Sequence, residues 1–207
     1  MLLEENKYVL PESNYVKLEN KKTQIVLCDT YNNNMGHFFG WKHRYNGNYN
    51  KTAAFTIDAA GFIYKHFEPI YQSKFFENDE LNNKTIVILL ENYGWLNKDD
   101  QKKQYITWLD DIYNKSTEIT DKRWRNKRYW DPYTQEQFDS TLMLVSKLCD
   151  KFGIPKTAIS HNTKIDNLKD FTGVLYRSNL STNYTDLNPS WDFDIFKEKL
   201  EQLWKKE

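Results

Sequence analysis

The chain has 207 residues, and its 29 Lys and Arg balance 29 Asp and Glu, so its formal net charge is zero. This length fits one domain with a sizeable core, and a neutral chain has no overall field that attracts nucleic acid or an anionic membrane. The sequence has no run of about 20 apolar residues, so no membrane span is predicted. Two glutamates follow Met1-Leu2-Leu3 at once, so no signal peptide is predicted and we expect a cytoplasmic protein.

The chain begins with a polar segment and then becomes apolar. Residues 1–23 are mixed in character, with Pro11 opposing a helix, and are expected to form an N-terminal arm. Residues 24–30 form a short apolar run that predicts a buried strand. This strand ends in a thiol, Cys28, and a carboxylate, Asp29, where the chain becomes polar again.

A loop, a hairpin and a central strand are predicted next. Residues 31–52 are rich in Asn and Gly, which predicts a long loop without a regular element. Two strand-like runs, residues 54–58 and 62–67, flank a glycine turn and predict a hairpin. Residues 68–83 are polar and loop-like again. Residues 85–90 are the most apolar run in the chain, which indicates a central strand buried on both faces.

The second half of the chain opens with an excursion from this core. Residues 92–131 are expected to leave the core, and residues 122–130 within them form a basic and aromatic cluster. A long helix is predicted to follow, because Thr134 and Gln137 have the spacing of a capping box. Apolar residues then recur at helical spacing until Gly153, which is expected to end the helix.

Three further segments complete the predicted fold. Residues 157–160 form a short strand, residues 162–191 are mostly loop, and residues 192–206 form a closing amphipathic helix. The order of strand, hairpin, central strand, helix, strand and helix predicts the α/β class. We expect a single domain with a central mixed β-sheet flanked by α-helices.

Segments of this chain resemble the zinc-dependent N-acetylmuramoyl-L-alanine amidases, which cut peptidoglycan. The resemblance is carried, in the family's order, by a first strand, a hairpin, a central strand, a long helix ending in Gly-Ile-Pro and a closing motif: residues 24–30, 55–64, 86–92, 133–155 and 185–193. It implies an amidase-like domain over residues 24–207, with an insertion at about residues 96–131.

The resemblance also implies a reaction and a set of residues. Three protein ligands hold a metal ion that keeps its fourth position for water. The metal makes that water more acidic, and a carboxylate takes the proton. In the family the ligands are a histidine on the first strand, a second histidine, and an aspartate or cysteine in the closing motif. A glutamate on the central strand and a lysine two residues before the last ligand complete the set.

This chain keeps one of these positions and departs at the others. Asp186 matches the last ligand, whereas Cys28 stands where the first histidine is expected. Leu89 falls at the place of the catalytic glutamate, although Glu91 follows two positions later. Tyr184 replaces the lysine. The resemblance therefore makes Glu91 and Tyr184 the candidates for the catalytic roles.

The second histidine has two candidate places. His161 follows an apolar run, as the second histidine of the family does. The distance in sequence from His161 to Asp186 is, however, longer than the family's spacing. That spacing instead selects Tyr176 or Arg177, and an arginine cannot bind zinc because it stays protonated.

Two states of the site follow. In the first, Cys28, His161 and Asp186 hold zinc, an acceptable ligand set, and residues 162–184 are an inserted loop. In the second, Arg177 fills the metal's place beside Asp186, and the pocket is inactive toward amides. The missing glutamate and lysine favour the second state, so zinc is doubtful as a cofactor.

Three functions remain open at this stage. One is an active amidase with an unusual zinc site, and another is a pseudo-amidase that binds muropeptide or glycan without cutting it. A third is a pocket that holds another small anionic ligand through Arg177, as in a phage-encoded sequestering protein. Trp124 and Trp130 either form a platform for such a ligand or pack inward. The expected partner is a peptidoglycan fragment or another small ligand, and weak or no hydrolysis is favoured.

Overall fold

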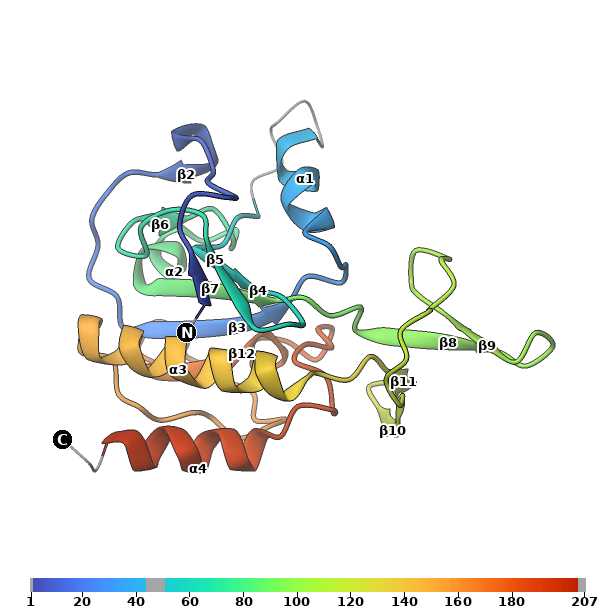
Figure 1. Ribbon diagram of the computed structural model, residues 1–207. Helices are drawn as coiled ribbons and strands as arrows, with labels where there is room; N and C mark the ends of the chain where they lie inside the picture. Colours follow the sequence, from blue (N-terminus) through green and yellow to red (C-terminus); the bar gives the residue numbers. More distant parts are fainter. Residues whose placement is uncertain (1, 44–50, 205–207) are drawn as a thin grey trace.

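The centre of the molecule is a six-stranded mixed sheet in the order β1-β5-β4-β7-β3-β12 (Figure 1). The computed structural model describes residues 2–43 and 51–204. The strands of this sheet, in chain order, are β1 (Leu2–Glu4), β3 (Gln24–Asp29), β4 (Phe55–Ile57), β5 (Phe62–Lys65), β7 (Thr85–Leu90) and β12 (Gly173–Tyr176). Because β4, β7, β3 and β12 run parallel, their carboxyl ends meet at one edge of the sheet.

The two middle strands confirm the sequence prediction. All six residues of β3 and all six of β7 are buried, and the register pairs Cys28 with Leu89. Strands covered on both faces are continuously apolar, and this pattern made both strands visible in the sequence. The predicted hairpin is also present, since β4 and β5 pair antiparallel.

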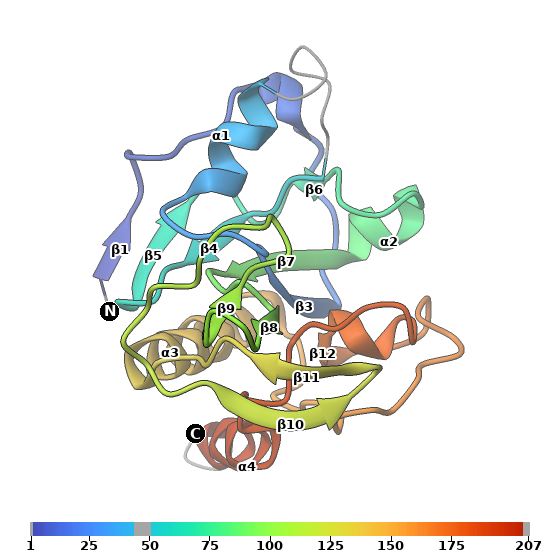
Figure 2. The same cartoon turned by 90° about the vertical axis from the view of Figure 1, so that its right-hand side faces the viewer.

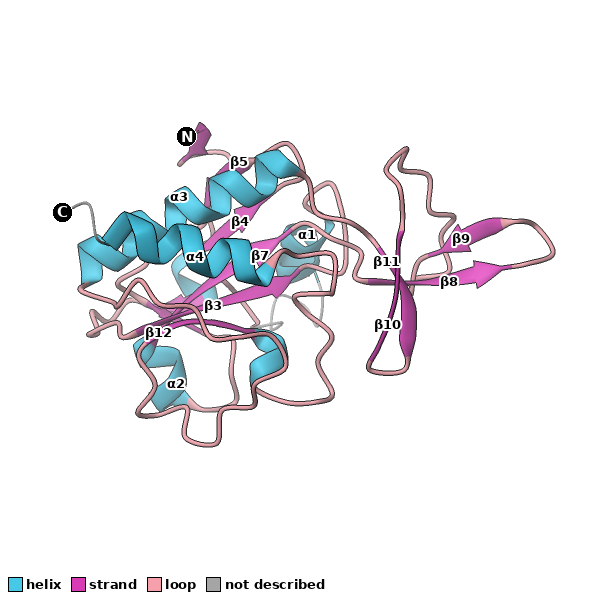
Figure 3. Cartoon of the chain, turned by 90° about the horizontal axis from the view of Figure 1, so that it is seen from below, coloured by secondary structure: helices cyan, strands magenta, loops and turns pink. Residues whose placement is uncertain are grey.

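Helices cover both sides of this sheet. Helices α3 (Gln135–Phe152) and α4 (Phe193–Trp204) lie side by side across one face, and α1 (Gly36–His43) lies on the other (Figures 1 and 3). A short helix, α2 (Asp79–Lys84), leads into β7. Among the described residues, no helix is long and apolar enough to cross a membrane. The α/β architecture with a central mixed sheet is therefore the one that the sequence predicted.

The start of α3 is capped as predicted, but only by one half of the capping box. The hydroxyl oxygen of Thr134 accepts the N–H of Gln137 at 3.1 Å. The Gln137 side chain does not return this bond; it donates to the carbonyl oxygens of Ile57 (3.0 Å) and Glu91 (3.2 Å). The helix start is thereby fastened to the ends of β4 and β7.

Three segments that the sequence predicted as loops contain regular elements. Helix α1 lies within residues 31–52, β6 (Gln72–Ser73) and all but the last residue of α2 lie within residues 68–83, and β12 lies within residues 162–191. These elements are short, and β12 is defined by its pairing with β3 rather than by a local pattern. The parts of the predicted loop and closing helix at residues 44–50 and 205–206 lie outside the described residues.

The predicted N-terminal arm contributes to two sheets. Strand β1 pairs in parallel with β5 at the edge of the central sheet. A 3-10 turn (Glu12–Asn14) leads into β2 (Tyr15–Val16), which pairs with β6. Residues 1–23 therefore do not form a separate appendage, because their strands pair with strands of the domain.

A second, antiparallel sheet projects from the body of the domain (Figures 1 and 3) and faces the viewer in Figure 2. Its strands are β8 (Trp95–Asp99), β9 (Gln104–Ile106), β10 (Thr120–Trp124) and β11 (Lys127–Trp130), in the order β10-β11-β8-β9. The buried carboxylate of Asp131 fastens its base. This carboxylate accepts from the N–H of Tyr93 (2.8 Å), the hydroxyl of Tyr113 (2.7 Å) and the amine of Lys115 (2.6 Å).

Alanine substitutions at Gly61 and Gly153 would measure how closely α3 packs on the hairpin. Both have positive φ, but a Cβ on Gly61 would lie 2.7 Å from the carbonyl oxygen of Glu136, whereas Gly153 has no atom within 4 Å of that position. Gly153→Ala is expected to cost about 1–2 kcal/mol, because of its left-handed backbone. Gly61→Ala should cost clearly more, measured by urea unfolding. Equal losses in the two variants would show that the hairpin and α3 are not in close contact.

Candidate functional site

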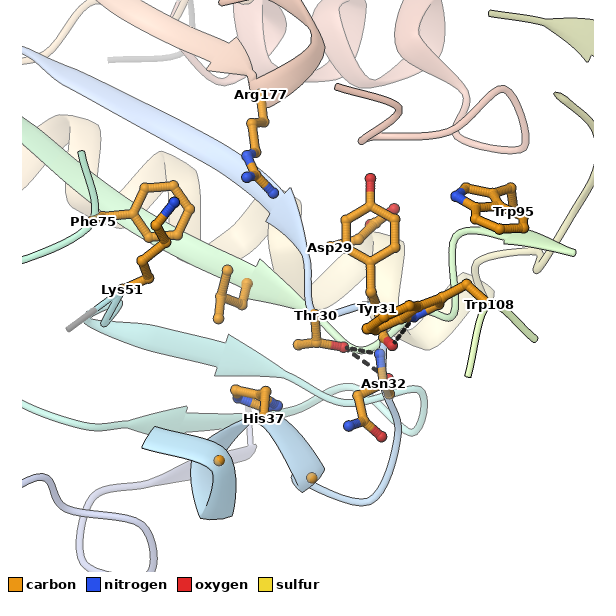
Figure 4. A pocket seen from close by; sticks show the side chains of 13 residues that line it. Asp29, Thr30, Tyr31, Asn32, His37, Lys51, Phe75, Trp95, Trp108 and Arg177 are labelled. Carbon is orange, nitrogen blue, oxygen red and sulfur yellow. Dashed lines mark hydrogen bonds between the residues drawn. The ribbon is translucent and has the colours of Figure 1, made fainter. Parts of the chain in front are cut away.

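A cavity of about 370 Å³ opens where the chain leaves the carboxyl ends of β3 and β7 (Figure 4). Its lining comes from the end of β3 and the residues after it, from α1 and β7, from the projecting sheet, and from the residue after β12. Ligands of open α/β sheets bind beyond the carboxyl ends of the strands, and a cavity of this size fits a small molecule. We therefore treat it as the candidate site.

A buried carboxylate stands beside this cavity. Asp186 is fully buried and accepts hydrogen bonds from the hydroxyl of Tyr31 (3.0 Å) and the backbone N–H of Asp29 (3.1 Å). The Nη1 atom of Arg177 lies 3.7 Å from its Oδ2 atom. Burial raises the pKa of Asp186, and the positive charge of Arg177 opposes that rise.

The guanidinium of Arg177 lines the cavity and has few protein partners. Its Cζ atom lies 4.1 Å from the ring centroid of Tyr184 and 5.7 Å from that of Phe75. Burial alone would lower the pKa of Arg177, but the Asp186 carboxylate raises it, so the group stays charged. Within the described part of the chain, the long contact with Asp186 is its one ion pair. Most of its five N–H donors are thus left for an acceptor in the cavity.

Cys28 does not line this cavity. Its side chain is fully buried in the core, and Leu89, its register partner on β7, is the residue that lines the cavity. Burial, followed by the nearby charge of Asp186, raises the pKa of the Cys28 thiol well above its usual range. Since the thiolate is the form that binds metals, the surroundings of Cys28 favour the role of a core residue.

His161 lies in an aromatic cluster. Its ring stacks on Phe193 with centroids 4.0 Å apart, and the ring of Trp124 is 4.7 Å away. Burial lowers the pKa of His161 to about 4. In residues 2–43 and 51–204, no group of three or more His, Cys, Asp or Glu is placed to hold a metal ion. Cys28, His161 and Asp186 are therefore not brought together as the zinc site of the first predicted state.

Glu91 holds a turn of the backbone at the end of β7. Its carboxylate accepts the N–H of Met35, in the turn that leads into α1. Burial raises the pKa of Glu91, and the bond from Met35 opposes the rise. Glu91 does not line the cavity, whereas Leu89 does. An apolar side chain thus occupies the position where the resemblance expects a catalytic carboxylate.

Arg125 positions the segment that carries Tyr184, a role that the sequence did not indicate. Its Nη1 atom donates to the carbonyl oxygens of Ser181 (2.8 Å) and Tyr184, and its Nη2 atom donates to that of Ser178 (2.9 Å). Tyr184 itself stacks on Arg177. The only signal in the sequence was that Arg125 belongs to the basic cluster, which does not reveal which carbonyl groups it reaches.

The predicted aromatic platform is not at the cavity. Trp130 is fully buried and donates to the carbonyl oxygen of Lys122 at 2.7 Å, so it packs inward and cannot contact a ligand. The indole N–H of Trp124 donates to Asn162 at 2.6 Å. Among the side chains that the structure describes, the tryptophans that line the cavity are Trp95 and Trp108, neither of which was singled out in the sequence.

A chain of neutral polar groups runs from the cavity wall into the core. The Nε2 atom of His37, which lines the cavity, lies 2.9 Å from the hydroxyl oxygen of Thr56, and that oxygen lies 2.8 Å from Nε2 of His66. Nδ1 of His66 lies 2.7 Å from the carbonyl oxygen of Tyr8, which can only accept. A neutral His66 therefore donates from Nδ1 to the Tyr8 carbonyl and accepts the hydroxyl proton of Thr56 at Nε2. The oxygen of Thr56 can then accept a hydrogen bond from Nε2 of His37.

A family model and several solved structures match this chain. A family model described as N-acetylmuramoyl-L-alanine amidase matches residues 18–170. The N-acetylmuramoyl-L-alanine amidase LysC from Clostridium intestinale has a similar structure, with TM-score 0.56 and 14% identity over 96% of this chain and 97% of that one. No curated protein sequence matches.

Two further solved structures share the fold. The Staphylococcus aureus hydrolase AmiA, in complex with its ligand, has TM-score 0.55 and 12% identity over 98% of this chain and 82% of that one. The amidase AmiD from E. coli was solved in complex with anhydro-N-acetylmuramic acid-L-Ala-D-gamma-Glu-L-Lys. It has TM-score 0.55 and 11% identity over 89% of this chain and 59% of that one. At these identities the likeness shows the fold.

The buried imidazole of His66 makes the stability of the fold dependent on pH. Burial lowers its pKa from 6.5 to about 4, so the folded state favours the neutral form. The stability that this contributes is complete above pH 6.5 and is lost as the pH falls through about 4, and the shift corresponds to about 3 kcal/mol.

Urea unfolding between pH 7 and pH 4 measures this loss. His66→Gln cannot take up a proton, so its free energy of unfolding should fall less steeply over this range than that of the wild type. The free energy of unfolding of His66→Gln should still fall somewhat with pH, because the pKa of His37 is also lowered, to about 3. Identical slopes for the two proteins would show that His66 is not buried in its neutral form.

Proposed function

The chain belongs to the N-acetylmuramoyl-L-alanine amidase family, and on this basis we propose that it binds a peptidoglycan fragment in the cavity without cutting it. One observation carries the proposal: the guanidinium of Arg177 lies beside Asp186, the residue that matches the family's last metal ligand. A permanent cation at this place repels a metal ion and attracts an acid. The site of hydrolysis thereby becomes a site for an anionic group.

The residues at this site do not fit a zinc ion. Asp186 already accepts from Tyr31 and Asp29 and faces Arg177. The thiol of Cys28 is buried in its protonated form. Leu89, at the position of the usual glutamate, cannot take a proton from an attacking water. These departures support weak or no hydrolysis of the amide bond.

The proposed ligand supplies the acid that Arg177 would bind. The fragment bound to the E. coli amidase AmiD contains a γ-linked D-Glu, and a γ-linkage leaves the α-carboxylate of that residue free. A guanidinium binds a carboxylate through two parallel N–H···O bonds, a geometry that gives both strength and orientation. Lys51, which also lines the cavity, adds a second positive charge.

A second candidate is another small anionic ligand, held without any link to peptidoglycan. The two cations on the cavity, Arg177 and Lys51, favour an acid of either origin. A protein that sequesters a free phosphate or carboxylate metabolite would use the same contacts. The two candidates differ in whether a muramyl peptide binds more tightly than simple acids do.

Calorimetric titration with N-acetylmuramyl-L-alanyl-D-glutamate tests the first candidate, with chromatography of the same mixture to detect the cleaved peptide. We expect binding and no cleavage, with or without added zinc. Arg177→Met should weaken binding about 10- to 100-fold, because hydrogen bonds to a charged group are lost. The affinity of Arg177→Lys should lie between those of the wild type and Arg177→Met, since lysine keeps the charge but not the paired donors.

A double variant separates loss of binding from loss of folding. Arg177→Met alone leaves the buried Asp186 without its cation, which destabilises a protein. Arg177→Met with Asp186→Asn removes both charges, so it should unfold at a higher temperature than the single variant and still bind weakly. Cleavage of the ligand by the wild type, or unchanged affinity in both variants, would contradict the proposal.

A further inference from the structure

Two tryptophans from the projecting sheet form one wall of the cavity. Trp95 lies on β8 and Trp108 follows β9, so neither belongs to the central sheet. Figure 4 shows both rings on one side of the cavity, close to Tyr31, while Arg177 enters from another side. We name Trp95 and Trp108 the aromatic wall.

Trp108 is held in place although its ring is open to solvent. Its indole N–H donates to the carbonyl oxygen of Tyr31 at 2.7 Å, across 77 residues of sequence. The residue is nevertheless 39% exposed. A large ring that is fixed by its polar edge and exposed on its apolar surface is suited to contact with another molecule.

Trp95 is supported from β11. The amine of Lys127 lies 3.2 Å from the ring centroid of Trp95, so it covers one face of the indole. Burial against the ring lowers the pKa of Lys127. Trp95 is half-buried and still lines the cavity. The aromatic wall is thus braced before any ligand binds, which lowers the entropy cost of binding.

We propose that the aromatic wall is a subsite for a pyranose ring. A sugar ring has an apolar C–H face, which packs on a flat indole, and polar edges, which need hydrogen-bonding groups nearby. Asn32 lines the cavity beside the wall, and its side-chain amide supplies such a group (Figure 4).

This inference rests on the proposed function and makes it more specific. The cavity would hold a glycopeptide by two ends, with an acid at Arg177 and a sugar ring at the wall. The acid end is built from the amidase fold, whereas the sugar end is built from the projecting sheet. Preference for a ligand that carries a sugar would therefore depend on Trp95 and Trp108 and not on the residues around Asp186.

Two probes that differ only in the sugar test the subsite by calorimetry: N-acetylmuramyl-L-alanyl-D-glutamate and the lactoyl dipeptide D-lactoyl-L-alanyl-D-glutamate, which keeps the amide at the alanine nitrogen. The wild type should bind the sugar-bearing probe about three- to tenfold more tightly, the range expected for one stacked ring. Trp108→Ala should abolish this difference and still bind the dipeptide, which meets only the acid end. Trp108→Phe, which keeps a ring, should retain part of it.

Leu109 provides the matched control. It is the next residue, it is equally exposed at 39%, and it does not line the cavity. Leu109→Ala should therefore bind both probes as the wild type does. Binding of the dipeptide by Trp108→Ala also shows that this variant is folded.

The outcomes separate this inference from the function on which it rests. If the wild type binds neither probe, both proposals are overturned. Equal binding of the two probes by the wild type, or equal weakening of both by Trp108→Ala, would overturn the sugar subsite and leave the proposed function standing. A loss of the sugar preference confined to the Trp108 variants supports the subsite.

Discussion

The structure around the cavity depends on one buried carboxylate. Asp186 receives the hydroxyl of Tyr31 and the backbone N–H of Asp29, and it faces the guanidinium of Arg177. A charge that is removed from water must be compensated by such partners, so the end of β3, the segment after it and the segment after β12 are fixed by the same group. The pairing also sets where Arg177 lies, and the guanidinium then presents its remaining donors to the cavity.

The projecting sheet supports this arrangement from outside the central sheet. Arg125 holds three carbonyl groups of the segment between Arg177 and Asp186, and Trp108 holds the carbonyl group of Tyr31. Asp131 fastens the base of this sheet to the domain. The projecting sheet therefore positions both the cationic side and the aromatic side of the cavity.

Sequence reasoning succeeded where burial leaves a local pattern. Strands β3 and β7 each contain a continuous apolar run because both faces are covered, and Thr134 and Gly153 mark the ends of α3. It failed where a tertiary contact decides, as for β12, which exists through its pairing with β3. Spacing to Asp186 pointed to Tyr176 or Arg177, and the side chains of Arg177 and Asp186 do lie together. His161 matched a motif but packs on Phe193, and the position of Trp108 depends on how the projecting sheet folds back.

The account rests on the claim that a guanidinium has taken the place of the metal ion. Its most direct test is the zinc content of the purified protein after dialysis against buffered zinc, compared with that of Cys28→Ser and Asp186→Asn. The account predicts far less than one equivalent of zinc in the wild type and no change in either variant. One equivalent of zinc in the wild type, lost in both variants, would contradict it.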